Sequence, residues 1–180
     1  MSLNKIQTLI EGLFIIEPKV FFDNRGYFFE PYNHQCFIDL IGTNINFVQD
    51  NQSSSDYGTI RGLHYQVGNF QQSKLIRVLK GEIFDVVVDL RLNSETFKQW
   101  FGINLSESNF KQLWIPRGFA HGFLCLSKKC QILYKVDNYY SKEHEKGISY
   151  KNKKLNINWP IADKIKISNK DKNYDLVFFI

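Results

Sequence analysis

The sequence predicts a mainly β protein, an antiparallel sandwich or barrel with a few short helical additions. Most segments alternate apolar and polar side chains with a period of two, which is typical of half-buried strands. Gly, Asn and Asp separate these segments at short intervals. Aromatic residues make up 16% of the chain, a composition suited to sheet faces. Since no internal repeat or linker divides the chain, we expect residues 1–180 to form a single domain.

The elements follow in order along the chain. A first strand is expected in "GLFIIE", ending before Pro18, and an Asp-Asn-Arg-Gly turn then leads into an aromatic strand from Tyr27 to Phe29. Helical periodicity occurs in "HQCFIDLIG", with Gly42 as the stop. The middle of the chain is all strand, in "KLIRVLK", "EIFDVVVDL", "WFGINLS", "FKQLWIP", "GFAHGFLCLS" and "CQILYKVDNYY". The Lys- and Asn-rich tail keeps apolar segments such as "LNINWP", so disorder is not predicted there.

Composition excludes several classes of partner. The net charge of +5 suits an anionic ligand, but the lysines are spread diffusely and no DNA- or RNA-reading motif is present, so nucleic acid is not expected. The three cysteines follow neither a C-x-x-C nor a zinc spacing, which predicts a reducing, cytoplasmic location. No stretch approaches 18 apolar residues, and we expect no membrane contact.

Two of the four histidines lie in unusual surroundings. His64 lies in "IRGLHYQ" and His121 in "IPRGFAHGF", and strand alternation places His64 and Gln66 on one face. The local pattern leaves three roles open for His64: metal ligand, proton-transfer base or packed core residue. His34 and His144 are flanked by polar residues and are expected at the surface.

These two segments resemble the cupin motifs. The Pro-x-Gly-x-x-His spacing of "IPRGFAH" is similar to the second motif of these small jelly-roll barrels, and Gly62-x-His64 is similar to the first. Metal-binding cupins carry a second histidine where this chain has Gln66, which removes a nitrogen ligand. The resemblance therefore implies a cupin-type double-stranded β-helix, or jelly roll, with no metal site of the usual type.

A longer series of segments narrows the resemblance. The segments "DNRGYFFE", "QDNQS", "GTIRGLHYQ", "QSKLIRVLKGEIFDVVVDLRLNSETF", "IPRGFAHGF", "LYKVDNYY", "INWP" and "ISNKD" occur in the order found in the nucleotide-sugar 3,5-epimerase family of cupins. The resemblance implies an isomerase that needs no cofactor and acts at C3 and C5 of a nucleotide-linked 4-keto-6-deoxyhexose. The expected reaction converts dTDP-4-dehydro-6-deoxy-D-glucose to dTDP-4-dehydro-L-rhamnose, on the route to surface-polysaccharide sugars. It also implies a homodimer, because family members commonly exchange a long N-terminal β-segment.

Such a reaction needs a base on one face of the sugar, an acid on the other and a cation near O4. The resemblance assigns the base to His64, with Asp171 as its carboxylate partner, and the cation to Lys74. It assigns the acid to Tyr134, a role that a phenol can fill when its surroundings bring its pKa toward the working range. Without the resemblance, Lys74 reads as an exposed lysine and Tyr134 as a packed strand aromatic.

The resemblance assigns further positions to substrate binding. They are Arg25 and Arg61 for the diphosphate, Phe28 and Tyr140 for the base, Glu30, Gln49 and Asn51 for the nucleotide and sugar, and His121 beside Asp85 for the sugar.

Three other functions remain open. One is epimerisation at C3 alone, or of another 4-keto nucleotide sugar, since the same base, acid and cation serve both. Another is a non-catalytic cupin that binds a sugar nucleotide. The third is a metal-dependent cupin enzyme, against which Gln66 argues. The chain also lacks the family's proline pair after Gln66 and its Trp-Asn-Asp-Pro-like segment before "INWP", differences that concern loops.

Overall fold

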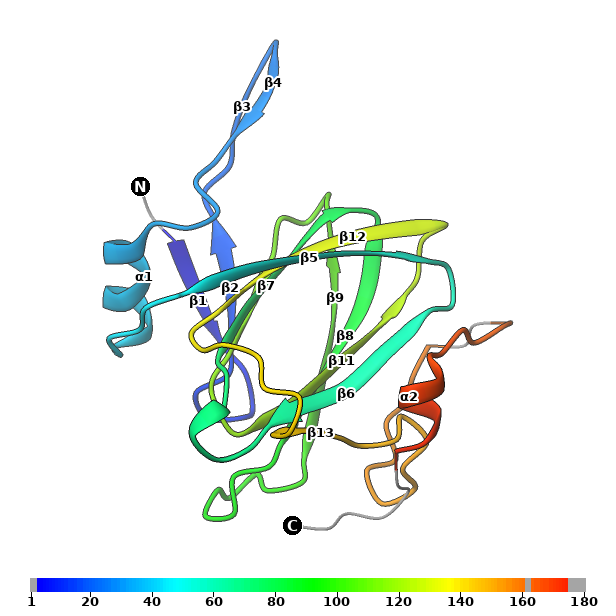
Figure 1. Ribbon diagram of the computed structural model, residues 1–180. Coiled ribbons are helices and arrows are strands. Elements are labelled where there is room, and N and C mark those ends of the chain that lie inside the picture. The colour runs from blue at the N-terminus through cyan, green and yellow to red at the C-terminus, as the bar shows by residue number, and fades with distance from the viewer. Residues whose placement is uncertain (1–2, 161–162, 175–180) are drawn as a thin grey trace.

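Two antiparallel sheets face each other in the computed structural model, which describes residues 3–160 and 163–174 (Figure 1). Six strands form one sheet in the order β1-β2-β10-β7-β12-β5, and five form the other in the order β13-β6-β11-β8-β9. The bounds are β1 Leu3–Gln7, β2 Phe14–Pro18, β3 Phe21–Asp23, β4 Gly26–Phe28, α1 His34–Ile41, β5 Gln49–Asp56, β6 Ile60–Gln66, a 3-10 turn Gly68–Phe70, β7 Lys74–Lys80, β8 Glu82–Asp89, β9 Trp100–Ser106, β10 Gln112–Ile115, β11 Phe119–Cys125, β12 Lys129–Val136, β13 Glu145–Gly147 and α2 Asn169–Lys172. The predicted mainly β class is confirmed.

Most strands lie where alternation predicted them, but several elements were not predicted, among them β3 and the 3-10 turn. β2 continues through Pro18, one residue beyond its expected end. β1, β5, β13 and α2 carry no clear sequence signal. The polar sequence of β5, "QDNQSSSD", forms a strand because it pairs along its full length with β12. Tertiary pairing, and not intrinsic propensity, therefore determines this strand.

The main apolar core fills the space between the two sheets. Ile76 and Leu113 of the six-stranded sheet pack in one cluster with Val87 and Phe123 of the five-stranded sheet. A second cluster covers the outer face of the five-stranded sheet with apolar residues that follow β13. All seven residues of β11 are buried, because this strand is covered on both faces. At one end of the space between the sheets, polar side chains replace the apolar core and line a cavity.

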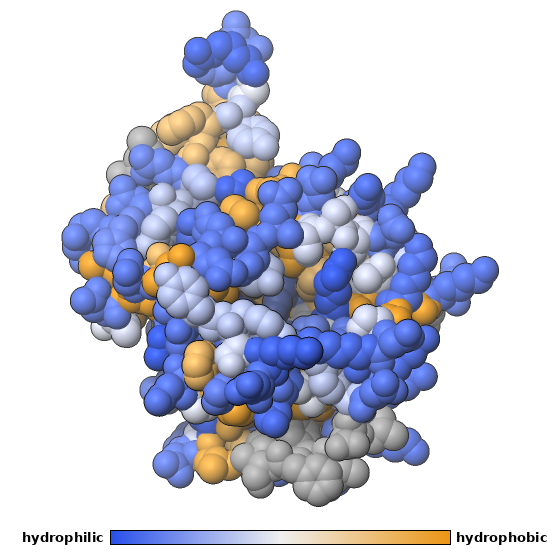
Figure 2. All heavy atoms as spheres, in the orientation of Figure 1, coloured by the Kyte–Doolittle hydropathy of each residue, from blue (hydrophilic) through white to orange (hydrophobic). Residues whose placement is uncertain are grey.

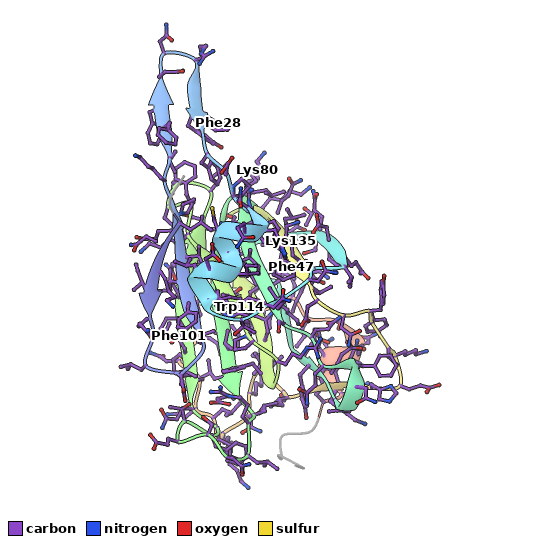
Figure 3. All side chains as sticks on the ribbon, turned by 90° about the vertical axis from the view of Figure 1, so that its left-hand side faces the viewer. Phe28, Phe47, Lys80, Phe101, Trp114 and Lys135 are labelled. Carbon is purple, nitrogen blue, oxygen red and sulfur yellow. The ribbon has the colours of Figure 1, made fainter. Side chains whose placement is uncertain are left out.

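Helix α1 covers part of the six-stranded sheet. The Asn33 side chain accepts a hydrogen bond from the Cys36 N–H at 3.1 Å, and Gly42 ends the helix with φ 72°, a conformation that favours glycine. Phe37 packs in one cluster with Trp114 of β10, on the side of the molecule that faces the viewer in Figure 3. No helix in the described part of the chain has the length and apolar character needed to cross a membrane.

The β3–β4 hairpin projects from the body of the molecule (Figure 1). Its aromatic side chains are largely uncovered, with exposed fractions of 70% for Phe22, 59% for Tyr27 and 60% for Phe28. Figure 2 shows a hydrophilic tip above an apolar stem, and Figure 3 shows Phe28 on this hairpin. Exposed aromatic surface of this kind is typical of an interaction site.

Candidate active site

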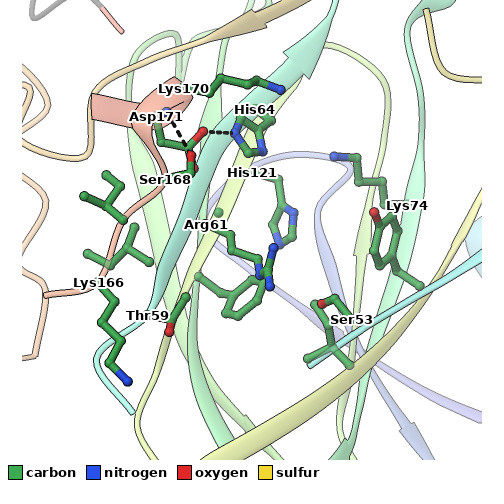
Figure 4. Close-up of a pocket in the computed structure, with 16 residues that line it drawn as sticks. Ser53, Thr59, Arg61, His64, Lys74, His121, Lys166, Ser168, Lys170 and Asp171 are labelled. Carbon is green, nitrogen blue, oxygen red and sulfur yellow. Dashed lines mark hydrogen bonds and ion pairs between the residues drawn. The ribbon is translucent and has the colours of Figure 1, made fainter. Parts of the chain in front are cut away.

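A cavity of about 550 Å³ lies between the two sheets at their polar end (Figure 4). A smaller cavity of about 200 Å³ adjoins it and shares three lining residues, His64, Lys74 and Tyr134. His64 comes from β6 in the five-stranded sheet, whereas Lys74 and Tyr134 come from β7 and β12 in the six-stranded sheet. The two sheets therefore contribute opposite walls to one continuous site.

His64 is paired with a carboxylate from the C-terminal segment. Its Nε2 lies 2.8 Å from Oδ1 of Asp171, and Oδ2 of the same carboxylate accepts a hydrogen bond from the Gly62 N–H at 3.2 Å. Asp171 is 4% exposed, although it lies in a Lys-rich tail where a solvated charge is the ordinary expectation. The structure thus brings together two of the predicted site residues.

Backbone hydrogen bonds hold the C-terminal segment beside β6. The Ile60 N–H donates to the Lys166 carbonyl and the Lys166 N–H donates to the Gly58 carbonyl, both at 2.9 Å. Ser168 then starts α2 by accepting a hydrogen bond from the Asp171 N–H at 3.0 Å. The segment extends the edge of the sheet next to β13, and this placement delivers Asp171 to His64.

The pKa of the Asp171 carboxyl results from opposing effects. Burial raises it, but hydrogen bonds from His64, Gly62 and Ser168, together with the nearby imidazole, outweigh burial and lower the pKa below its ordinary value. Asp171 is therefore ionised at neutral pH. An ionised carboxylate holds the imidazole in one orientation and stabilises its protonated form.

Lys74 is not the exposed lysine that its position at a strand start suggests. Its ammonium group lies inside the site (Figure 4), and burial lowers its pKa to about 8, even though the charges of Asp85 and Glu145 oppose the shift. At neutral pH the group is still mostly protonated. It can therefore supply a positive charge in a poorly solvated space, where such a charge acts strongly on a ligand oxygen.

Tyr134 faces the cavity from β12, and its pKa is raised. Burial raises the pKa of the phenol above its usual value of 10.0; the charge of Arg61 opposes this shift and that of Glu145 adds to it. The pKa is not brought toward the neutral range, because desolvation penalises the phenolate. The phenol is instead held protonated, which suits a proton donor.

His121 forms a second histidine–carboxylate pair at the bottom of the site. Its Nε2 lies 3.0 Å from each carboxylate oxygen of Asp85, and both side chains are buried. His121 lies directly opposite His64 in the β11–β6 register. The two imidazoles, which sequence alternation could not place relative to each other, therefore share one wall.

Arg61 lies at the open side of the larger cavity. Its Nε donates to the Ser55 hydroxyl at 2.9 Å, and its guanidinium also donates to the Ser54 carbonyl at 3.1 Å. Lys166 and Ser53 line the same cavity. This arrangement presents two cations and a hydroxyl toward a space that suits an anionic group.

The smaller cavity holds three of the predicted nucleotide residues. Gln49 and Asn51 point into it from β5, with the Gln49 amide donating to Oδ1 of Asn51 at 2.7 Å. Tyr140 lies beyond the end of β12 and donates its hydroxyl to Oε2 of Glu145 at 2.7 Å. Tyr140 is therefore not part of the strand that carries Tyr134, which ends at Val136.

The residues predicted on the first hairpin are not at the cavity of their own chain. Arg25 is exposed and paired with Asp23 at 2.6 Å, Phe28 is exposed on β4, and Glu30 follows that strand. The lining of both cavities contains none of these three residues. The expected joint contact of Arg25 and Arg61 with one diphosphate is therefore not assembled within a single chain.

Sequence reasoning missed several lining residues. Glu145 accepts hydrogen bonds from Tyr140 and, at 2.6 Å, from Lys170, whose side chain also lines the larger cavity. Lys166 lies nearby in the same tail. Isolated lysines in a Lys-rich tail carry no signal that separates them from solvated charges. His144 also differs from expectation, because it is half-buried and stacks on Phe70 with ring centroids 4.2 Å apart.

No group of three or more His, Cys, Asp or Glu side chains is arranged to hold a metal within residues 3–160 and 163–174. The polar groups of Gln66, which stands at the cupin ligand position, are bonded to backbone.

Comparisons with known proteins agree with this geometry. Residues 7–177 match the sequence model of the dTDP-4-dehydrorhamnose 3,5-epimerase family. The chain is 49% identical to the dTDP-4-dehydrorhamnose 3,5-epimerase of Shigella flexneri, over 95% of this chain and 94% of that protein.

Two crystal structures extend the likeness to the fold. The dTDP-4-dehydrorhamnose 3,5-epimerase of Elizabethkingia anophelis is 46% identical with a TM-score of 0.93, covering 97% of this chain and 96% of that one. The dTDP-6-deoxy-D-glucose-3,5-epimerase of Legionella pneumophila, solved in complex with dTDP-4-keto-L-rhamnose, is 47% identical with a TM-score of 0.92, covering 95% and 90%. The expected cupin jelly roll is thereby confirmed, and the chain belongs to the dTDP-4-dehydrorhamnose 3,5-epimerase family of isomerases.

Proposed function

We propose that this chain epimerises C3 and C5 of dTDP-4-dehydro-6-deoxy-D-glucose with His64 as base and Tyr134 as acid. The observation that carries this assignment is the placement of the two side chains on facing sheets, across one cavity. Inversion at a carbon requires that a proton leaves one face and another arrives on the opposite face. An acid and a base on opposite walls meet this requirement without any movement of the protein.

The proton transfers use the C4 carbonyl of the substrate. Protons on C3 and C5 are both α to this carbonyl, so each can be removed when the resulting enolate is stabilised. With Nε2 donating to Asp171, the lone pair of the His64 ring lies on Nδ1, which takes the proton. The Lys74 ammonium then stabilises the enolate oxygen, and the protonated phenol of Tyr134 delivers a proton to the other face.

The substrate is oriented by groups on both sides of the reacting ring. The His121–Asp85 pair holds the sugar from below, since a buried carboxylate keeps that imidazole in one tautomer. Arg61 binds the diphosphate at the cavity mouth. Tyr140, Gln49 and Asn51 surround the nucleotide in the adjoining smaller cavity.

The active assembly is a homodimer in which a second copy supplies its hairpin to this cavity. Support comes from the hairpin itself, which projects away from the site of its own chain and leaves Phe28 largely exposed (Figure 1). In the dimer, Arg25 joins Arg61 at the diphosphate, while Phe28 and Glu30 complete the nucleotide site. One domain spanning residues 1–180, a cytoplasmic location and a reaction that needs no cofactor all stay predictions.

Solvent deuterium incorporation tests the function. In D₂O, NMR with dTDP-4-dehydro-6-deoxy-D-glucose is expected to show deuterium at both C3 and C5, together with formation of the rhamno product. Exchange at C3 alone would indicate a 3-epimerase. Binding of the nucleotide sugar with exchange at neither carbon would indicate a non-catalytic binding protein and contradict the proposal.

A further inference from the structure

The side chain of Gln66, which lines the smaller cavity, uses both ends of its amide in hydrogen bonds. Gln66 is 8% exposed and lies two residues after His64 on β6. Its Nε2 donates to the Phe70 carbonyl at 2.8 Å and to the Tyr139 carbonyl at 3.2 Å. Its Oε1 accepts from the Ser141 N–H at 2.6 Å. Both ends of this amide are therefore used, and every partner is backbone.

Two of these partners lie on either side of Tyr140. The carbonyl of Tyr139 and the N–H of Ser141 are the backbone groups that flank this residue. Gln66 engages both with one planar amide, in the manner of a strand neighbour. No strand is assigned at residues 137–144, so the side chain takes the place of ladder hydrogen bonds at this point.

We propose that Gln66 is a positioning residue that holds Tyr140 in place as a wall of the nucleotide site. This inference rests on the proposed function, in which Tyr140 contacts the nucleotide. Residue 66 is the position at which metal-binding cupins carry a metal ligand, and the inference gives it a different role in this chain. The amide of Gln66 acts through Tyr140 and does not itself have to touch the reacting atoms.

The surrounding contacts make this effect local. The Gln72 amide donates to the Asn138 carbonyl at 2.7 Å, and the Asn138 amide donates to the Asn69 carbonyl at 2.8 Å. His144 stacks on Phe70 with centroids 4.2 Å apart. The loops at residues 67–73 and 137–144 thus remain joined when Gln66 is changed, and the groups that lose a partner are the Phe70 carbonyl and the two backbone groups that flank Tyr140.

The phenol of Tyr140 links the same wall to the catalytic pair. Its hydroxyl donates to Glu145, Glu145 accepts from Lys170, and Lys170 precedes Asp171, which bonds His64. A chain of contacts therefore leaves β6 at Gln66 and returns to it at His64. A loose Tyr140 is expected to weaken nucleotide binding first, because Asp171 has its own bonds to Gly62 and Ser168.

The test is a double-mutant cycle with Gln66→Met and Tyr140→Ala, read by calorimetric binding of dTDP and by kcat and KM. Methionine keeps the length of the side chain and removes its hydrogen bonds. We expect Gln66→Met to raise the Kd for dTDP and the KM about tenfold with kcat within about twofold. In the Tyr140→Ala background the same change is expected to have almost no further effect on Kd.

Gln52→Met is the matched control, because Gln52 is an exposed amide on β5 that points away from the cavity side of Asn51. If Gln66→Met does not fold, Gln66→Glu serves in its place, since it keeps the acceptor for Ser141 and loses both donated hydrogen bonds. Thermal unfolding separates a folding defect from a binding defect.

Two results would overturn the inference: an unchanged dTDP affinity in the Gln66 variant, or additive losses in the cycle. A loss of kcat at unchanged dTDP affinity would place the effect at the sugar and not at Tyr140. Binding of dTDP needs no turnover, so the double-mutant cycle can be measured even if the parent protein shows no exchange. Absence of exchange would contradict the proposed function and would leave the inference about Gln66 to be decided by the binding data.

Discussion

Nε2 of His64 lies 2.8 Å from Oδ1 of Asp171, although 107 positions separate the two residues. The contact exists because the C-terminal segment lies along β6 and is held there by backbone hydrogen bonds at Ile60 and Lys166. The base and its supporting carboxylate therefore depend on the docking of a short tail onto a sheet edge.

Replacing the carboxylate of Asp171 is expected to lower kcat with little change in KM. In Asp171→Asn the amide no longer stabilises an imidazolium, and it can hold the ring in the wrong tautomer. A loss of about 10²- to 10⁴-fold in kcat is expected from comparable pairs. Steady-state kinetics measure it, with Asp163→Asn, an exposed carboxylate of the same tail, as the control. Equal activity in the two variants would remove Asp171 from the mechanism.

Removing the phenol of Tyr134 is expected to separate exchange from inversion. In Tyr134→Phe, His64 still removes the α-proton, but no acid on the opposite wall returns one, so deuterium enters with retention. Product formation should fall about 10²- to 10⁴-fold, while exchange into the substrate continues. NMR in D₂O follows both signals, and Tyr139→Phe, a change at an exposed tyrosine, is the control. Parallel loss of both signals would argue against Tyr134 as the second acid.

We expect kcat to fall as the pH rises through about 8, because burial lowers the pKa of Lys74 to about this value. The protonated form stabilises the enolate, so its loss removes that stabilisation. Lys74→Met should abolish this limb together with most of the activity. Lys80→Met, at the exposed end of the same strand, should leave the profile unchanged. A wild-type profile that stays flat up to the pH at which the protein unfolds would contradict the assignment.

The lowered pKa of Lys74 also makes the free energy of unfolding depend on pH in a direction that can be worked out. The pKa of this lysine is about 8 in the folded state against an ordinary value of 10.5 for a solvated lysine, so the unfolded chain binds more protons between these two values. Stability should therefore be lower below about pH 8 and rise toward about pH 10.5, by at most about 3 kcal/mol. Denaturant unfolding of the wild type and Lys74→Met at about pH 7 and about pH 9.5 tests it. Lys74→Met should be the more stable protein at the lower pH, and the difference should shrink at the higher one.

If the hairpin is exchanged between subunits, two inactive variants should restore activity to each other in a mixed dimer. A variant with Arg25→Ala and Phe28→Ala lacks a working hairpin, and His64→Ala lacks the base, so each homodimer should be nearly inactive. Refolding them together in equal amounts should restore about a quarter of the wild-type activity, because half the dimers are mixed and each has one intact site. No recovery, with mixed dimers confirmed by mass, would mean that the hairpin does not act across the dimer.

Much of the site was predictable from local sequence. Strand alternation placed His64 and Gln66 on one face, and the ordered motifs identified Lys74 and Tyr134, all of which line the cavities. The strands from β7 to β12 were located from their apolar residues and the turn residues between them. Alternation is a property of neighbouring residues, so it survives without knowledge of the fold.

The sequence by itself determined the fold class, the family and the residue types that line the site. Only the tertiary structure decided how they act together. It enclosed Lys74 and Tyr134 in the cavity walls, where partial burial lowered the pKa of the lysine and raised that of the tyrosine, since desolvation disfavours the charged form. It brought Asp171 to His64 and turned Gln66 toward the backbone on both sides of Tyr140. These are contacts between distant segments, and no local pattern encodes the distance between residues that meet only when the sheets close.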